Sequence, residues 1–313
     1  MRPRDGHRCG SLRSGPQRAL RCAHADPLKD GLTLLRSSPL DDSAAAAHTA
    51  HVVNAACDAL RLALRGHPVN VRRAAAGRPA ASCLLLRGPG CALCERPFCE
   101  THPPYAAAAV APTKIIAGLA KSLGMRLLDA PGATGDYRSD FGAKAAATAE
   151  ALSSAVSPTF VLLHVKAVDD AGHDRATSLK VAYLAQCDAL LGALAARLAA
   201  AGGEAARAVI AVTGDHSTPV AFGDHSFEPV PIALARADAL VDALGGRDAV
   251  AALPLVVVGR GGAVTEAPPV CVGGPPGFDE LSAARGGLGR FPGSALMKLL
   301  KAFAAMDDEQ PTG

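Results

Sequence analysis

From about residue 112 onwards, short apolar runs alternate with longer segments of helical periodicity. The apolar runs have the length of strands and lie at 126–129, 159–166, 208–213 and 230–234. The periodic segments predict helices at 113–124, 139–154, 178–200 and 294–305. Strands that alternate with helices of crossover length favour an α/β fold of three layers with a mostly parallel sheet.

The N-terminal part of the chain carries a weaker pattern. Residues 1–47 are rich in turn formers, a helix is predicted over 49–65, and the run 82–87 predicts a buried strand. Near the other end, the stretch 268–290 is Gly-rich and irregular. The more regular alternation of strands and helices begins only near residue 112.

Composition excludes several classes of protein. With 313 residues, of which 49% are hydrophobic and 19% charged, the chain can bury a sizeable core. Its formal net charge of +3 comes from scattered basic residues, which argues against recognition of nucleic acid by charge. No uninterrupted apolar run of about 18 residues predicts a membrane-spanning helix.

The first 22 residues hold six arginines and one aspartate, a balance that resembles an organelle transit peptide. The Ser-rich amphipathic run of such peptides is missing. We therefore expect a cytoplasmic protein, with an organelle as the alternative.

Four of the nine cysteines lie between Cys83 and Cys99. Cys91, Cys94, Cys99 and His102 have the spacing C-x2-C-x4-C-x2-H, which could close a small zinc site. A surface loop with free thiols explains the same residues, because proline and glycine punctuate the segment. The loop is the favoured interpretation, and zinc binding remains the alternative.

Carboxylates and imidazoles follow two of the predicted strands. Asp169 and His173 come after the run 159–166, and the doublet Asp215-His216 comes directly after the run 208–213. His225 follows nine residues later, within GDHSFEPVP. Ligands of such sheets collect beyond the carboxyl ends of the strands, so these positions are where a site is expected.

The five residues share one chemistry. Carboxylate and imidazole suit divalent ions such as zinc, manganese or magnesium, and two Asp with three His exceed what one tetrahedral catalytic site takes from protein. The set therefore suggests two metal ions, an arrangement that serves in-line transfer at phosphorus with the ions about 4 Å apart. Each residue taken singly is explained as well by a loop start or a structural histidine, and only the combination favours metal binding.

Eight segments of the chain carry a family resemblance. The downstream ones are ATGDYRSDFGAK (133–144), HVKAVDDAGHD (164–174), TGDHSTPVAFGDHSFEPVPI (213–232) and GGLGRFPGSALMKLL (286–300). The upstream ones are DPLKDG, HPVNVRR (67–73), LLLRGPG (84–90) and APTKIIAGLAKSLGM (111–125). In this order they resemble the cofactor-independent, archaeal-type phosphoglycerate mutases, which are members of the alkaline phosphatase superfamily.

The resemblance implies a three-layer αβα core of the alkaline-phosphatase type with an inserted α+β cap domain. Residues 1–105 would then be part of the cap, and residues 106–313 the C-terminal part of the core. The implied activity is the interconversion of 3-phosphoglycerate and 2-phosphoglycerate in glycolysis, with two Mn²⁺ or Mg²⁺ ions as cofactors. The expected protein is a monomer that binds phosphoglycerate and neither nucleic acid nor membrane.

The resemblance also implies a division of the ligands between the two ions. Asp169, His173 and His225 would hold one ion, while Asp215 and His216 would supply half of the shell of the other.

Three basic residues are candidate substrate contacts. Lys114 is similar in position to a substrate-neutralising lysine of the family. Arg73 and Arg87 are suggested by chemistry, because a guanidinium fork fits both phosphate and carboxylate. Ordinary surface arginines are an equally good interpretation of Arg73 and Arg87.

The family pattern lacks its beginning here. In the family, a strand with a G-D-G turn carries a metal-binding Asp, and a later P-G-S-D segment carries the Ser that takes the phosphoryl group. Neither occurs in this sequence, and Ser14-Gly15-Pro16 has the wrong order. We expect a truncated chain whose nucleophile is unknown. The alternatives are a metal-dependent phosphohydrolase of the same superfamily and a non-catalytic metal-binding relic.

Overall fold

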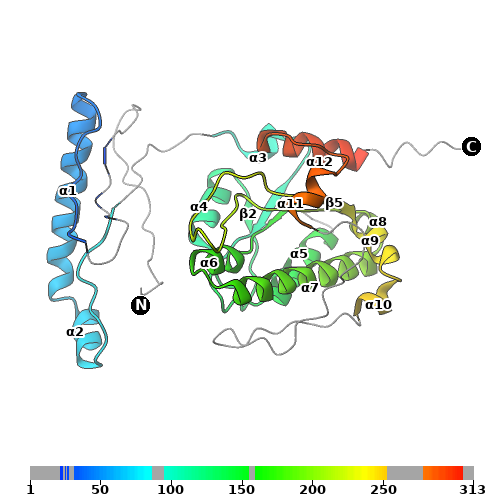
Figure 1. Ribbon diagram of the computed structural model, residues 1–313, viewed down its shortest axis with the longest axis horizontal. Helices are drawn as coiled ribbons and strands as arrows, with labels where there is room; N and C mark the ends of the chain where they lie inside the picture. The colour runs from blue at the N-terminus through cyan, green and yellow to red at the C-terminus, as the bar shows by residue number, and fades with distance from the viewer. Residues whose placement is uncertain are drawn as a thin grey trace, which may run out of the picture. The chain divides into compact units, whose positions relative to one another are not determined.

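The computed structural model describes residues 22, 23, 25, 27, 32–86, 95–154, 159–251 and 278–305. The chain divides into two compact units, Met1–Cys94 and Glu95–Gly313. Helices α1 and α2 lie in the first unit and the strands β1 to β5 in the second, where Figure 1 labels β2 and β5. The division lies upstream of residue 105, and the assignment of the first unit to a cap stays a prediction.

The first unit contains the predicted helix and a second helix directly after it. Helix α1, Ala44–Arg65, begins earlier than predicted because Ser43 caps it, with its Oγ accepting from the Ala46 amide at 3.1 Å. Helix α2, Pro68–Ala75, begins with proline at a position where the missing N–H costs nothing. Pro68 therefore starts α2 only three residues after α1 ends.

Two asparagines connect the segments around these helices. Asn54 on α1 accepts from the Ser37 amide and donates to the Ser37 carbonyl, both at 2.9 Å. The buried Asn70 donates to the carbonyls of Leu64 and Ala81 and accepts from the Ala81 amide. These bonds hold irregular backbone that has no ladder of its own.

The predicted strand at 82–87 is wrong over residues 82–86, which form no strand. Leu86 accepts one backbone hydrogen bond, from the Ala25 amide, but no second strand pairs with the segment among the described residues. An apolar run becomes a strand only where a neighbour satisfies its backbone. Residue 87 lies outside the described residues.

The second unit is built on a parallel sheet of three strands. Strands β1 (Ala107–Val110), β2 (Arg126–Leu127) and β3 (Phe160–Leu163) lie in the order β2-β1-β3. Helix α4, Lys114–Ser122, connects β1 to β2, and helix α5, Phe141–Ser153, connects β2 to β3. Both helices and the strands β2 and β3 confirm sequence predictions with shorter bounds.

The strand order determines where the helices lie. The chain steps from β1 to one side and then crosses back to the other, so two right-handed crossovers place α4 and α5 on opposite faces of the sheet. Helix α4 contacts β1 and β2, and α5 contacts β1 and β3. The predicted α/β fold with three layers is confirmed, and its switch point lies between β1 and β3, where ligands of such sheets bind.

Strands β4 (Val209–Thr213) and β5 (Ile232–Arg236) pair antiparallel in a separate sheet. Both confirm predicted strands, but their pairing departs from the parallel arrangement. The connection between them contains no helix, so the chain simply returns alongside β4. This connection, residues 214–231, holds three of the predicted ligands.

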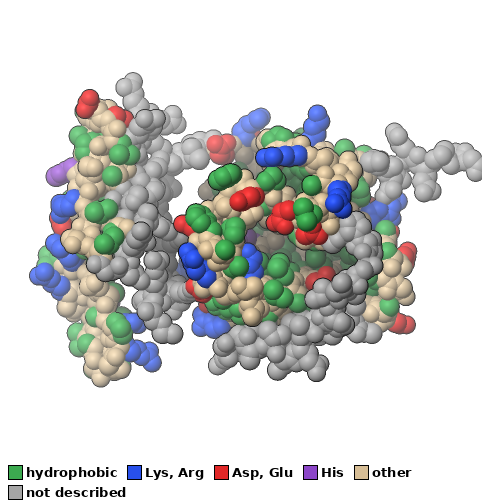
Figure 2. All heavy atoms as spheres, in the orientation of Figure 1, with side chains coloured by type: hydrophobic (Ala, Val, Ile, Leu, Met, Phe, Trp, Pro, Cys, Tyr) green, Lys and Arg blue, Asp and Glu red, His purple; other side chains and the backbone are tan. Residues whose placement is uncertain are grey.

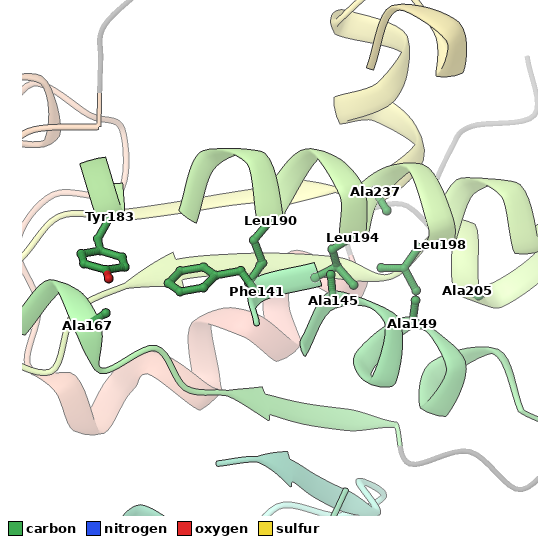
Figure 3. Close-up of a cluster of buried hydrophobic side chains, with 10 residues drawn as sticks. All are labelled: Phe141, Ala145, Ala149, Ala167, Tyr183, Leu190, Leu194, Leu198, Ala205 and Ala237. Atoms are coloured by element: carbon green, nitrogen blue, oxygen red, sulfur yellow. The ribbon is translucent and has the colours of Figure 1, made fainter. Parts of the chain in front are cut away.

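Helix α7, Thr177–Ala201, is the longest helix and forms the core with α5. Figure 3 shows Leu190, Leu194 and Leu198 on one face of α7, directed toward Phe141 and the alanines of α5. By length and composition alone α7 could cross a membrane. Its leucine face instead packs in this core.

Shorter helices complete the second unit. Their bounds are α3 Phe98–Thr101, α6 Ala167–His173, α8 Gly203–Ala206, α9 Ala237–Ala243, α10 Arg247–Ala251, α11 Glu280–Ala284, the 3-10 turn η1 Gly293–Ala295 and α12 Leu296–Ala305. The last two confirm the predicted closing helix, while α11 places a short helix within the stretch expected to be irregular.

One charged side chain lies inside this core. Lys144 on α5 is only 1% exposed, and its Nζ donates to the His164 carbonyl at 2.9 Å, directly after β3. Its Nζ also lies 5.5 Å from the centre of the Phe141 ring. Burial lowers the pKa of Lys144 to about 8 and raises the pKa of the neighbouring Cys187 to about 11.

Candidate metal centre

Helix α6 presents the first two predicted ligands. Asp169 lies in its first turn and His173 at its last residue, four positions apart, so both side chains project from one face. Their functional atoms are close, with His173 Nε2 3.4 Å from Asp169 Oδ2. The spacing D-x-x-x-H is therefore a helical spacing.

The connection after β4 brings two further histidines to the same point. His225 Nε2 lies 3.0 Å from His173 Nε2 and 3.5 Å from Asp169 Oδ1. The ring of His216 contacts that of His225 in a tilted arrangement, with ring centres 3.6 Å apart, and His216 Nδ1 lies 4.0 Å from Asp169 Oδ1. Four of the five predicted ligands thus converge.

Asp215 is the predicted ligand that does not join the cluster. Its side chain is 75% exposed, and its Oδ2 lies 3.4 Å from Nε2 of the adjacent His216. Asp224 takes a place that the sequence reasoning missed, since its carboxylate, His173 and His225 offer ligand atoms within 4.8 Å of one another. The tetrapeptide GDHS occurs twice, at 214–217 and 223–226, and this repeat could have revealed Asp224.

The loop that carries His216 and His225 is tied tightly to α6 and α7. Arg175 donates to the carbonyls of Ala221 and Phe222, and Lys180 donates to the Thr218 carbonyl. Ser217 and Ser226 form a β-bridge that closes the loop. These bonds fix the histidines before any ligand arrives.

Gly172 and Arg175 show how tightly α6 and the residue after it pack against the loop that carries His216 and His225. Gly172 packs so tightly that a Cβ there would lie 2.4 Å from the Thr218 carbonyl oxygen. Arg175 follows α6 with φ of +55°, a left-handed conformation that costs a non-glycine residue free energy. The strained backbone at Arg175 is held by the two carbonyls that its side chain binds.

The electrostatics of the cluster suit a cation. His173 Nδ1 donates to the Gly223 carbonyl at 3.2 Å, which leaves the lone pair of a neutral ring on Nε2. Burial lowers the pKa of His225, and the neighbouring His216 and His173 lower it further, so the neutral, metal-binding form is favoured. The carboxylate and imidazole donors therefore fit a divalent metal ion.

Two polar atoms without hydrogen-bond partners among the described residues lie just after the carboxyl ends of β1 and β3. Thr113 Oγ1 and His164 Nδ1 are buried and have no hydrogen-bond partner among the described residues. Thr113 follows β1 and His164 follows β3, so they lie on the two sides of the switch point. Buried polar atoms usually have partners, and these two are consistent with a ligand-binding crevice.

The predicted substrate contacts belong to different parts of the chain. Lys114 is exposed at the first residue of α4, just after β1. Arg73 lies on α2 in the first unit, where its Nε donates to the Pro79 carbonyl at 2.8 Å. Arg87 lies outside the described residues, as do Cys91 and Cys94 of the possible zinc site. Within the described part of that motif, Cys99 is exposed and His102 packs on Phe98.

Comparison with known proteins agrees with this fold. Residues 99–300 match the family described as the Metalloenzyme superfamily, and the chain belongs to that family, whose core is of the alkaline-phosphatase type. Membership in a metalloenzyme family and the ligand groups on the structure together support a divalent metal site.

Similar curated proteins are named 2,3-bisphosphoglycerate-independent phosphoglycerate mutase. The one from Metallosphaera sedula is 36% identical over 228 residues, which are 73% of this chain and 53% of that protein. The one from Methanopyrus kandleri is 34% identical over 300 residues, which are 96% of this chain and 62% of that protein. The chain therefore spans between half and two thirds of the length of these relatives.

A solved structure supports the fold. The PH0037 protein from Pyrococcus horikoshii superposes with a TM-score of 0.62 at 28% sequence identity, over 86% of this chain and 60% of that one.

Proposed function

We propose that this chain is the metal-binding part of a 2,3-bisphosphoglycerate-independent phosphoglycerate mutase, which interconverts 3-phosphoglycerate and 2-phosphoglycerate in glycolysis. The observation that carries the proposal is the convergence of Asp169, His173, His216 and His225 at one edge of the fold. The names of the similar proteins support the substrate.

The residues divide their work in this proposal. Asp169, His173 and His225 hold one ion, and His216 with Asp215 contributes to a second. The exposed Asp215 carboxylate, 3.4 Å from His216 Nε2, would have to turn toward the cluster to do so. When bound, Mn²⁺ or Mg²⁺ would neutralise phosphate charge and lower the pKa of an attacking hydroxyl.

Other residues bind and orient the substrate. The ammonium of Lys114 follows the carboxyl end of β1, where an anionic substrate of such a sheet is expected. Arg73 and Arg87 remain proposed contacts for phosphate or carboxylate. We propose that the nucleophilic serine belongs to the P-G-S-D segment of the family, which this sequence lacks. A cytoplasmic monomer is part of the same proposal.

Metal binding is the first test. Mn²⁺ at about 100 times its dissociation constant is expected to stabilise the protein by about 2.7 kcal/mol, measured by thermal unfolding. His225→Ala and Asp169→Asn are expected to lose this stabilisation. His51→Ala is the matched control, because His51 is an exposed histidine on α1 in the first unit. Equal stabilisation of all four proteins would contradict the site.

Activity is the second test. The chain with Mn²⁺ and 3-phosphoglycerate is assayed in an enolase-coupled reaction, alone and with the N-terminal segment of the Methanopyrus kandleri relative. Turnover that needs both the added segment and His225 supports the proposal. Turnover by the chain alone would refute the assignment of the nucleophile to the missing segment. Hydrolysis of p-nitrophenyl phosphate that exceeds mutase turnover would indicate a phosphohydrolase instead.

A further inference from the structure

Lys166 lies between two neighbouring carboxylates at the start of α6. Its Nζ forms a close ion pair with Asp169 Oδ2 and lies 3.3 Å from Asp170 Oδ1. Neither carboxylate is fully solvated, since the Asp169 side chain is 17% exposed and the Asp170 side chain 26%. A half-buried carboxylate needs a compensating cation, and Lys166 supplies it to Asp169.

The ammonium lies beside one of the carboxylate oxygens that could hold a metal ion. Asp169 Oδ2 is the oxygen nearest His173 Nε2, at 3.4 Å, and His173 Nε2 in turn faces His225 Nε2. The other oxygen, Asp169 Oδ1, accepts from Thr218 Oγ1 at 2.6 Å. A divalent ion held by Oδ2 and His173 would therefore lie next to the Lys166 ammonium, and the two positive charges repel strongly in a partly buried site.

We propose that Lys166 is the counter-ion of Asp169 in the metal-free protein, and that metal binding transfers its ammonium to Asp170. This inference rests on the metal site of the proposed function. The transfer needs only rotations of a flexible side chain, because Asp170 is the next residue on α6 and its Oδ1 is already 3.3 Å from the ammonium.

The exchange has two consequences. It keeps the cluster of Asp169, His173 and His225 intact without metal. The reason is that the negative charge of Asp169 always has a cation beside it and never faces only the lone pairs of the imidazoles. It also lowers the metal affinity below what the ligands alone provide, since every binding event must break the pair between Lys166 and Asp169. Asp170 partly offsets that loss by receiving the ammonium.

The experiment measures Mn²⁺ affinity by isothermal titration calorimetry in a double-mutant cycle. Lys166→Met is expected to bind Mn²⁺ about tenfold more tightly, which corresponds to about 1.4 kcal/mol of binding free energy. Asp170→Asn is expected to bind severalfold more weakly than the unaltered chain. In the Lys166→Met background, Asp170→Asn is expected to have much less effect on the affinity, because the ammonium that Asp170 would receive is absent.

A distant lysine provides the matched control. Lys298→Met makes the same substitution at an exposed position on α12 and is expected to leave the Mn²⁺ affinity unchanged. Crystals grown with and without Mn²⁺ give an independent readout, in which Lys166 Nζ moves from Asp169 to Asp170.

Several results would overturn the inference. Lys166→Met with unchanged or weaker affinity means that the lysine does not compete with the metal. Asp170→Asn with the same effect in both backgrounds means that Asp170 acts by its charge alone. An unaltered chain that binds no Mn²⁺ removes both this inference and the metal site. Normal Mn²⁺ binding and the expected cycle, with no mutase turnover even when the N-terminal segment of the Methanopyrus kandleri relative is added, refute only the proposed activity.

Discussion

The buried Lys144 makes a prediction about stability and pH. Lys144 is charged at pH 7 although it is 1% exposed, and burial lowers its pKa from 10.5 to about 8. A cation with a lowered pKa in the folded state destabilises folding at pH values where it is charged in both states. Stability is regained as the pH rises from about 8 toward 10.5, because the unfolded chain then binds more protons than the folded one.

The magnitude follows from the size of the shift. The full penalty below pH 7 is at most about 3.4 kcal/mol. Between pH 7 and pH 9.5 the folded protein is expected to regain about 2 kcal/mol of it. Lys144→Met removes the titration and keeps most of the stem, at the cost of the hydrogen bond to the His164 carbonyl, worth about 1 kcal/mol.

Urea unfolding at several pH values tests this reasoning. We expect Lys144→Met to be more stable than the unaltered chain at pH 7 and to lose that advantage by pH 9.5. Lys144→Met and the reference chain that retains Lys144 are both prepared with Cys187→Ala. Burial raises the pKa of this neighbouring thiol to about 11, so its titration would lower the stability as the pH rises. Lys298→Met, an exposed control, is expected to change stability by less than about 0.5 kcal/mol at every pH. A difference between Lys144→Met and the unaltered chain that stays constant with pH would refute the argument.

Three further predictions concern the elements that hold the site. In urea unfolding, Gly172→Ala is expected to destabilise the protein by about 2 kcal/mol or more, because the new Cβ would lie 2.4 Å from the Thr218 carbonyl oxygen. The control Gly118→Ala, on an open face of α4, should instead stabilise the protein by up to about 1 kcal/mol in the same assay. Arg175→Gly relieves a left-handed backbone but removes two hydrogen bonds to the loop that carries His225. Limited proteolysis is therefore expected to cut that loop faster, while the free energy of global unfolding changes little. Equal cleavage rates would contradict the role of Arg175 in holding the loop. Asp140→Ala removes the cap that accepts from the Ala143 amide at 2.8 Å and should cost about 1 kcal/mol, whereas Asp140→Ser should retain most of it.

The sequence predicted the helices α1, α4, α5, α7 and α12 and the outer strands β2 and β3, but not the central strand. Strand β1 has the sequence AAAV and lies fully inside the unit, with Ala108 and Ala109 at 0% exposure. Alanine has no preference for strands, so nothing local distinguishes this segment from a loop. It becomes a strand because β2 and β3 pair with both of its edges. The opposite error at 82–86 has the same cause, since no strand among the described residues pairs with this apolar segment.

Surface charge illustrates how far composition reaches. On the face shown in Figure 2, acidic and basic side chains are interspersed over the described residues of the second unit, as scattered basic residues in the sequence predict. Composition says nothing, however, about the pairing of individual charges. The forked contact of Lys166 with Asp169 and Asp170 depends on the first turn of α6, an element that was not predicted.

The predicted ligands converge for a reason that differs from the one that suggested them. Asp169 and His173 were placed after a strand, in the expected loop, yet they meet because α6 puts residues four apart on one face. A seven-residue helix with two acids and a glycine has too little apolar pattern to be recognised from sequence. His216 and His225 reach α6 only because Arg175, Lys180 and the close approach at Gly172 hold their loop against it. Convergence at the cluster is therefore set by contacts between α6 and the loop after β4, and substitutions at those contacts should weaken metal binding without touching a ligand.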